Sequence, residues 1–394
     1  MKIIFIEPLI STNTMGGAQK SLLHLMLGLK KKKYDVVLAI PGDSDLTKKA
    51  KEANIQVEKY FLPKLLSTRI TYKKYRFFNL FFAIINIFFL VVASISLSRI
   101  SVKNRVNIIH SNQALVSITA GLVALFMNAK CVWHIRENPS KHVRAYVLKI
   151  YGIISYLLSD VIIVNSKYTA KIYNNTLASK KIKIVPIGVR DIYMKFYQSG
   201  PLKKYVTNKK SSDKVISTFG RVIFSKGYLS LLKATKILEK KGFRFNLNIY
   251  GNYNGYDSYY KSLIEFVKEK SLSSNVLFLG YRDNVEKNIY ASDLVVAPSI
   301  EPESFGRTLI ESMSARTPVI ASDLGAHAEL IIDNVDGFLF EPNNEIQLAE
   351  KIMMVFNQQK LTDKIVIRAH EKCKKYFSIE KYTNSIESIY RNLN

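Results

Sequence analysis

Short apolar runs alternate with longer helical stretches along the whole chain of 394 residues, and this alternation constrains the fold more than any other feature. Short runs rich in Val, Ile and Leu are typical of strands buried on both faces of a parallel sheet. The expected strands are 2–7, 35–40, 107–112, 131–137, 160–166, 182–188, 214–221, 246–251, 275–281, 293–299, 317–323 and 336–340. The sequence therefore predicts an α/β fold with two doubly wound, Rossmann-like domains.

The domain boundaries follow the same pattern. The first domain is expected over 1–190 and the second over 214–378, and each is long enough to bury its own core. The stretch 191–213 is polar and basic and interrupts the alternation, which is typical of a linker. Residues 379–394 carry apolar side chains at helical spacing and are predicted to form a C-terminal helix.

The charge is strongly basic and unevenly distributed. There are 58 Lys and Arg against 31 Asp and Glu, a net charge of +27, and most of the excess lies in the first half of the chain. Such a field attracts a polyanion, either a nucleic acid or an anionic membrane. With 48% hydrophobic residues, the chain is too apolar for a disordered basic tail.

Cysteine use indicates the compartment. Two cysteines, Cys131 and Cys373, cannot form a disulfide framework in a chain of this length. The opening residues pass straight into an expected strand without a signal-peptide pattern. We therefore expect a reducing, cytoplasmic environment.

Residues 77–98 form an uncharged apolar stretch that breaks the soluble pattern. As a helix it would run roughly 33 Å, enough to span a bilayer. A span would, however, separate strands that belong to one sheet. Basic residues also flank both ends: Lys73, Lys74, Arg76, Arg99, Lys103 and Arg105. We favour a helix that lies in or on an anionic membrane, with 64–105 as the contact segment; burial against the sheet and a true span are the alternatives.

The pair Glu303 and Glu311 carries the most specific chemical signal. Ser304 is a plausible N-cap, and the residues from Phe305 to Ala315, beginning Phe305-Gly306, are expected to form a helix. Exposed N–H groups at a helix start bind phosphate, and carboxylates on either side accept hydrogen bonds from hydroxyls. This arrangement suits a nucleotide-sugar; the alternative is a pair of solvated helix charges.

A second motif follows the first strand of the second domain. Gly220-Arg221 ends the strand, and Lys226-Gly227 opens the next helix. A guanidinium and an ammonium at such a turn can neutralise a diphosphate, Arg by a planar fork and Lys as a point charge. The alternative is isolated surface charge.

Near the amino terminus, Gly16-Gly17 precedes an amphipathic helix. Two glycines allow close backbone approach to a phosphate at a helix start, although a simple turn explains them equally well.

The carboxyl ends of the first-domain strands carry polar side chains, where ligands bind in open α/β sheets. Trp133-His134-Ile135-Arg136-Glu137 closes one strand, and a lone histidine there is either functional or structural. Residues ending other strands at this edge are His110, Ser111, Asn112, Asn165 and Ser166.

Metal chemistry is not indicated. The six histidines show no ligand spacing, and no C-x-x-C occurs. We expect no metal and no cofactor.

Glu303 to Glu311, with Phe305-Gly306 between them and Pro318-Val319-Ile320 after them, resembles the E-x7-E signature of the family 4 retaining glycosyltransferases. The other motifs occur in the order that this family shows, so the resemblance covers nearly the whole chain. It implies a GT-B fold, with a cleft between two Rossmann-like domains and a last helix, 379–394, that packs back across them.

The resemblance also implies a role for each motif. Glu303 would contact the transferred sugar and Glu311 the ribose hydroxyls, while Arg221 and Lys226 would hold the diphosphate. The remaining donor-binding groups would be Gly16, Gly17, Gly220, Tyr281, Ser304, Phe305 and Gly306. His134 would lie beside the donor sugar. The acceptor side would include Arg136, Glu137, Asn112 and Asn165.

The resulting hypothesis is a retaining, metal-independent hexosyltransferase at the cytoplasmic face of the cell membrane. It would transfer a sugar from a nucleoside-diphosphate donor to a hydroxyl of a lipid-linked, polyprenyl-type glycan, as in bacterial capsule or O-antigen synthesis. Two alternatives remain: a sugar-nucleotide epimerase on the same fold, and a basic nucleic-acid-binding protein. No helix-turn-helix, zinc or RNP-type pattern supports the latter, so we expect no nucleic-acid partner.

Overall fold

A computed structural model describes residues 1–8, 14–63, 69–72, 75–78, 80–139, 143, 145–190, 193 and 213–393. The chain divides into two compact units. The first contains Met1–Val185 and Tyr382–Asn394, and the second contains Pro186–Lys381. The division falls slightly before the expected end of the first domain at residue 190. The expected linker, 191–213, lies outside the described residues except for Tyr193 and Asp213.

The first unit is built on a parallel sheet of seven strands in the order β3-β2-β1-β6-β7-β8-β9. The strands are β1 (Lys2–Ile6), β2 (Asp35–Ile40), β3 (Gln56–Lys59), β6 (Ile108–Ser111), β7 (Lys130–Ile135), β8 (Val161–Val164) and β9 (Ile182–Ile184). The strand order reverses between β1 and β6, which pair with Ile3 opposite Ile108. All six strands expected in this half of the chain are confirmed. Their apolar residues are buried on both faces of the sheet except on the edge strand β9, where Ile184 is exposed.

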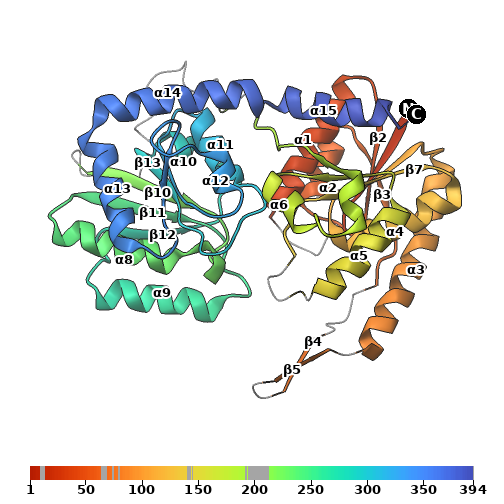
Figure 1. Cartoon of the computed structure of the whole chain (residues 1–394), viewed down its shortest axis with the longest axis horizontal. Coiled ribbons are helices and arrows are strands. Elements are labelled where there is room, and N and C mark those ends of the chain that lie inside the picture. The colour runs from red at the N-terminus through yellow and green to blue at the C-terminus, as the bar shows by residue number, and fades with distance from the viewer. Residues whose placement is uncertain are drawn as a thin grey trace. The chain divides into compact units, whose positions relative to one another are not determined.

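Helices connect these strands. They are α1 (Gly17–Lys31), α2 (Asp45–Glu52), α3 (Leu80–Lys103), α4 (Ala114–Met127), α5 (Ala145–Leu158) and α6 (Lys167–Ile172), with the short 3-10 helix η1 (Leu177–Lys181). The amphipathic stripe expected after Gly16-Gly17 is confirmed, since Leu22, Leu25 and Met26 are fully buried on α1. In Figure 1, α3, α4 and α5 form one layer beside the first sheet, with α4 packed against both neighbours.

The prediction of a single helix over 77–98 is wrong at both ends. Phe77 and Phe78 belong to β5 (Tyr75–Phe78), which pairs antiparallel with β4 (Arg69–Tyr72). The helix α3 begins after this hairpin and continues to Lys103. Within it, Ile84–Lys103 is long and apolar enough to cross a membrane, by length and composition only, and 22% of it is buried. One side of α3 packs against the first unit and the other side is exposed. The helix thus has features of both the burial and the membrane-contact alternatives.

The second unit contains a parallel sheet of six strands in the order β12-β11-β10-β13-β14-β15. The strands are β10 (Lys214–Phe219), β11 (Phe245–Tyr250), β12 (Val276–Gly280), β13 (Leu294–Ala297), β14 (Val319–Ser322) and β15 (Phe338–Phe340). The helices are η4 (Phe224–Lys226), α8 (Tyr228–Lys240), α9 (Asp257–Glu269), α10 (Glu286–Tyr290), α11 (Arg307–Ser314), α12 (His327–Leu330), α13 (Glu345–Asn357) and α14 (Gln359–Tyr376). This order reverses between β10 and β13, so ligands are expected at the carboxyl ends of those two strands.

The final helix, α15 (Ile379–Arg391), brings the chain back to the first unit. Its residues Tyr382, Ile386 and Tyr390 are buried. The Tyr382 hydroxyl accepts a hydrogen bond from Arg136 at 2.8 Å. The last turns of the chain therefore complete the core of the unit in which the chain begins.

Candidate active site

The loops after β10 and β13 meet at the reversal point of the second sheet. The backbone N–H of Ile300 donates to the Ser225 carbonyl at 2.9 Å. A Cβ added to Gly227 would lie 1.9 Å from the Pro298 carbonyl oxygen, and Gly227 also has a φ of +68°. Only glycine permits this approach. The Lys226-Gly227 motif is thereby fixed against the loop that leads to Glu303.

Lys226 and Glu303 form an ion pair through Nζ and Oε1, with side chains that are 27% and 23% exposed. The Ser299 hydroxyl donates to the same Glu303 oxygen at 2.7 Å. Burial alone would raise the pKa of Glu303. The nearby charges of Lys226 and His327, together with these hydrogen bonds, outweigh burial and lower the pKa to about 2. Glu303 is therefore a carboxylate that accepts hydrogen bonds at neutral pH, and not a proton donor.

The helix start differs from the prediction. α11 begins at Arg307 with Gly306 as its N-cap, two residues later than expected from Ser304 as the cap. Gly306 has a φ of +111°, and a Cβ there would lie 2.9 Å from the His327 ring. The left-handed backbone and the tight contact make this turn possible only for glycine.

Phe305 also differs from its expected place among the donor-binding groups. Its side chain is 4% exposed and packs edge to face on Phe377, with ring centroids 6.0 Å apart. Only the backbone of Phe305 remains for a ligand. The side chain instead anchors the loop between Glu303 and α11 in the core.

Glu311 lies about one turn into α11 and is 5% exposed. Its Oε1 accepts from Arg307 Nε at 2.8 Å. The buried Tyr193 lies close enough that Glu311 contributes, after burial, to raising the pKa of this tyrosine. The carboxylate is thus held between a guanidinium and a phenol.

Gly220 and Arg221 follow β10, and Tyr281 follows β12, so all three lie at the same edge of the sheet as Lys226. The Arg221 side chain is exposed. The Tyr281 hydroxyl donates to Asp283 at 3.3 Å. Gly220, Arg221, Tyr281 and Lys226 thus follow strands at one edge of the second sheet, and their donor-binding roles stay predictions.

In the first unit, the acceptor-side residues gather at the carboxyl edge of the sheet. Asn112 follows β6, Arg136 follows β7 and Asn165 follows β8. Arg136 Nε donates to Asn112 Oδ1 at 2.5 Å. Glu137 is the exposed neighbour of the buried Arg136. The structure thus brings these predicted residues together, with the guanidinium inside and the carboxylate outside.

His134 is fully buried in this cluster. Its Nε2 donates to Asn165 Oδ1 at 3.1 Å, because that oxygen can only accept. Its Nδ1 lies 3.2 Å from His110 Nε2 and therefore accepts. Burial first, then the charge of Arg136, lowers the pKa of His134 well below its ordinary value. The imidazole is neutral and held by the protein on both sides; its role beside the donor sugar stays a prediction.

Gly16 caps α1, and Gly17 is the first residue of that helix. Both are exposed. The Gly16 N–H donates to Gln19 Oε1 at 3.1 Å, so the turn is closed by the helix it begins. This geometry leaves the turn open to a ligand on its outer side.

The sequence analysis does not predict three polar residues that follow strands in the two units: Glu7, Ser299 and His327. Glu7 directly follows β1, Ser299 lies in the loop after β13, and His327 is the first residue of α12, after β14. The available signal in the sequence was therefore the end of each strand. Glu7 is not predicted as a site residue because it is the last residue of the first expected strand, 2–7. His327 was hidden because no ligand spacing marks it.

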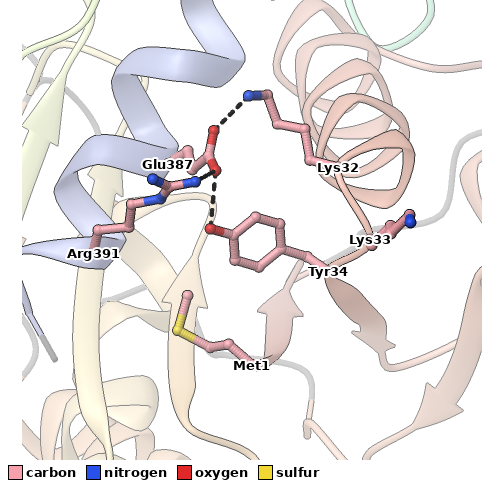
Figure 2. A pocket seen from close by; sticks show the side chains of 6 residues that line it. All are labelled: Met1, Lys32, Lys33, Tyr34, Glu387 and Arg391. Atoms are coloured by element: carbon pink, nitrogen blue, oxygen red, sulfur yellow. Dashed lines mark hydrogen bonds and ion pairs between the residues drawn. The ribbon is translucent and has the colours of Figure 1, made fainter.

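A cavity of about 350 Å³ opens elsewhere in the first unit, lined by Met1, Lys32, Lys33, Tyr34, Glu387 and Arg391 (Figure 2). Met1 and Tyr34 precede β1 and β2, so the cavity lies at the amino edge of the sheet, opposite the predicted site. Glu387 pairs there with Lys32 and accepts from Tyr34 at 3.1 Å. At this cavity, Glu387 on α15 is bound to Lys32 and Tyr34.

No group of three or more His, Cys, Asp or Glu side chains that could hold a metal ion occurs among the described residues.

Two all-parallel, doubly wound sheets with polar groups at their carboxyl edges define the GT-B class of α/β proteins, which confirms the predicted fold. Residues 15–191 match the model of Glycosyltransferase Family 4, and residues 201–372 match that of Glycosyl transferases group 1. The chain belongs to the family 4 glycosyltransferases with the GT-B fold.

Individual relatives agree with this assignment. An uncharacterized glycosyltransferase of Methanocaldococcus jannaschii is 31% identical over 176 residues, 44% of this chain and 47% of that protein. The chain thus spans about half the length of this relative. The capsular polysaccharide biosynthesis glycosyltransferase CapM of Staphylococcus aureus is 23% identical over 68% of this chain and 73% of that protein. Anabaena HepE, solved with UDP and glucose, superposes with a TM-score of 0.79 at 19% identity, covering 99% of each chain.

Proposed function

We propose that this protein is a retaining glycosyltransferase that transfers a hexose-type sugar from a nucleoside-diphosphate donor to an acceptor hydroxyl. The observation that carries the proposal is the Lys226–Glu303 ion pair at the reversal point of the second sheet, in a chain of this family. The UDP and glucose bound to HepE make a UDP-sugar the first donor to test.

The second unit supplies the donor site in this proposal. Lys226 and Arg221 neutralise the diphosphate, and Glu311 accepts hydrogen bonds from the ribose. Tyr281 meets the base. Glu303, kept ionised by Lys226, accepts hydrogen bonds from hydroxyls of the transferred sugar.

The reaction breaks the bond between the anomeric carbon and the diphosphate oxygen and forms one from that carbon to the acceptor oxygen. The acceptor proton passes to the departing diphosphate, whose charge Lys226 and Arg221 stabilise. Attack from the face that the diphosphate leaves preserves the anomeric configuration. No metal is required in this scheme because side-chain cations do its work.

The proposed acceptor is a lipid-linked glycan of the polyprenyl type. The similarity to CapM supports a place in the synthesis of a surface polysaccharide. Asn112, Arg136, Glu137 and Asn165, at the carboxyl edge of the first sheet, are the groups proposed to bind the acceptor.

A membrane-docking surface supports a lipid-linked acceptor. More than half of the large apolar side chains that are exposed in the described part of the chain lie on α3, α4 and α5. We call this set the apolar layer: Phe81, Ile84, Ile87, Phe88, Val91, Ile95, Val102, Leu125, Phe126, Tyr146, Val147, Ile150, Ile153 and Leu157. These three helices contain no acidic residue, but do contain Arg99, Lys103 and Lys149. Apolar area among cations suits an anionic bilayer.

We therefore propose peripheral attachment at the cytoplasmic face of the cell membrane. The segment assigned to this contact, 64–105, lies partly outside the described residues. Lys73 and Lys74 are among the residues that are not described. The described part of α3 supplies the contact in this proposal.

Product analysis with labelled UDP-sugars and a polyprenyl-linked glycan tests the activity. We expect acceptor-dependent transfer with retained anomeric configuration, unaffected by a metal chelator. K226A and E303A should lose transfer at least about 100-fold while remaining folded. Lys233→Ala, which removes a surface cation paired with Glu345 in the same unit, is the matched control. Isomerised donor without acceptor would favour the epimerase alternative, and near-normal turnover of either site variant would contradict the site.

A further inference from the structure

We propose that Glu7 is a positioning residue that holds the Gly16-Gly17 turn and the Asn112–Arg136 pair in one arrangement. This inference rests on the proposed function, with Arg136 as a proposed acceptor contact, and on the donor-binding role that the family resemblance implies for Gly16 and Gly17. Glu7 itself touches neither substrate, since its side chain is fully buried.

Glu7 directly follows β1, at the strand next to the reversal point of the first sheet. Its Oε2 accepts from the Asn112 side-chain amide at 2.6 Å. Its Oε1 accepts from the amides of Gln113 at 2.6 Å and Gln19 at 3.4 Å. Three amide donors, two from the loop after β6 and one from the first turn of α1, therefore converge on one carboxylate.

Two of the three donors, Gln19 and Asn112, lead onward to a predicted substrate contact. Gln19 uses its other atom, Oε1, to accept from the Gly16 N–H at 3.1 Å. Asn112 uses its Oδ1 to accept from Arg136 Nε at 2.5 Å. A primary amide has one donor and one acceptor side, so Glu7 fixes which way round both amides face.

A carboxylate suits this position better than any isostere. All three neighbours present N–H groups, and an ionised Glu offers two oxygens that only accept. A Gln at position 7 would turn an NH2 group toward Asn112 or toward Gln113 and Gln19. One of the two loops would then lose its acceptor.

The protonation state of Glu7 predicts a pH dependence of activity that can be measured. Burial raises its pKa to about 7, against the lowering effects of the Asn112 and Gln19 hydrogen bonds and the charge of Arg136. The other titratable groups nearby are Tyr60, whose hydroxyl donates to the Glu7 carbonyl at 3.2 Å, and His110 and His134. Burial raises the pKa of Tyr60 and lowers that of both histidines, so none of them titrates near pH 7.

The test compares wild type, E7Q and Glu58→Gln between pH 5.5 and 8.5, with separate KM values for donor and acceptor. Glu58 is a first-unit carboxylate on β3 that pairs with Lys103, away from this cluster. We expect wild-type kcat/KM to fall about tenfold as pH drops from 8 to 6, since the protonated Glu7 loses one acceptor site. E7Q should be at least tenfold less active at pH 8 and should lack this pH dependence, whereas E58Q should behave like wild type.

A second variant keeps the test decisive if E7Q does not fold. Gln19→Ala breaks only the connection from Glu7 to Gly16, so the KM for the donor should rise several-fold while the KM for the acceptor is unchanged. The inference is overturned if E7Q keeps wild-type activity and pH profile, or if Q19A changes neither KM. If wild-type protein transfers no sugar at all, the proposed function fails instead, and the two failures are thereby distinguished.

Discussion

Lys226 and Glu303 are 77 positions apart in the sequence, and their side chains form an ion pair between the loops that follow β10 and β13. The pair keeps Glu303 ionised in a half-buried setting where an isolated carboxyl would hold its proton. It also places a cation and an anion side by side. This arrangement suits the proposed donor, because a sugar diphosphate carries charged oxygens beside neutral hydroxyls.

The Glu303 ion pair predicts acid sensitivity of the second unit. The folded pKa of about 2 lies below the unfolded value of 4.5. The stabilisation is therefore present above about pH 4.5 and is lost as pH falls toward 2, with a magnitude of up to about 3 kcal/mol. Urea unfolding at several pH values should show wild type and E303Q differing at pH 7 and converging only near pH 2. A constant difference would argue against the pair, and E239Q, on the surface pair with Lys236, serves as control.

Close packing at Gly227 predicts a large loss of stability on substitution. G227A forces a Cβ against the Pro298 carbonyl, in addition to the cost of a positive φ. Gly242 has a similar φ of +72° with open space around it, so Gly242→Ala isolates the backbone cost. We expect G242A to lower the free energy of unfolding by about 1 kcal/mol and G227A by at least about 3 kcal/mol. Equal losses in thermal unfolding would show that the two loops do not meet.

The buried Tyr390 hydroxyl predicts a second stability effect, in the first unit. It donates to His110 Nδ1 at 2.6 Å, because His110 Nε2 already donates to His134. Y390F leaves that nitrogen buried without its donor, which should cost about 1–3 kcal/mol. Tyr34→Phe removes one hydrogen bond from Glu387, whose carboxylate keeps those from Lys32 and Arg391, so this change should cost less than about 1 kcal/mol. Calorimetry that finds the same loss for both variants would contradict the role of Tyr390.

The apolar layer predicts reversible binding to anionic vesicles. I87E places a carboxylate on α3 at a side chain that is 62% exposed, where it meets both lipid tails and lipid charge. Flotation with vesicles of mixed zwitterionic and anionic lipid should fall at least about fivefold for I87E. Ile367→Glu, at a 52% exposed position on α14, should float like wild type. Unchanged flotation of I87E, or no flotation of wild type, would remove the membrane proposal.

The sequence predicts all of the strands that are buried on both faces, because continuous Val and Ile runs have few other uses. It does not predict β3, whose residues Gln56, Glu58 and Lys59 suit a solvent-exposed edge. The hairpin before α3 is missed for a different reason. Phe77 and Phe78 continue the apolar composition of the helix, and composition does not show where a strand ends and a helix begins.

The site is predictable where a residue type has a fixed place relative to a strand end. Lys226, Glu303 and Arg136 are found in this way. Burial is not predictable by the same means: His134 lies near the end of β7 and Phe305 in the loop after β13, but the side chains of both face the interior. The Glu7 cluster depends on amides from separate loops, and such convergence exists only in three dimensions.

The return of α15 to the first unit has a consequence for how this protein is made. Tyr382, Ile386 and Tyr390 leave the ribosome after the whole second unit, yet they fill the core of the unit that emerges first. Domains ordinarily fold in the order of their synthesis. Here the second unit can finish folding while the core of the first is still incomplete. A stop codon just before Tyr382 would therefore damage the unit that is made first.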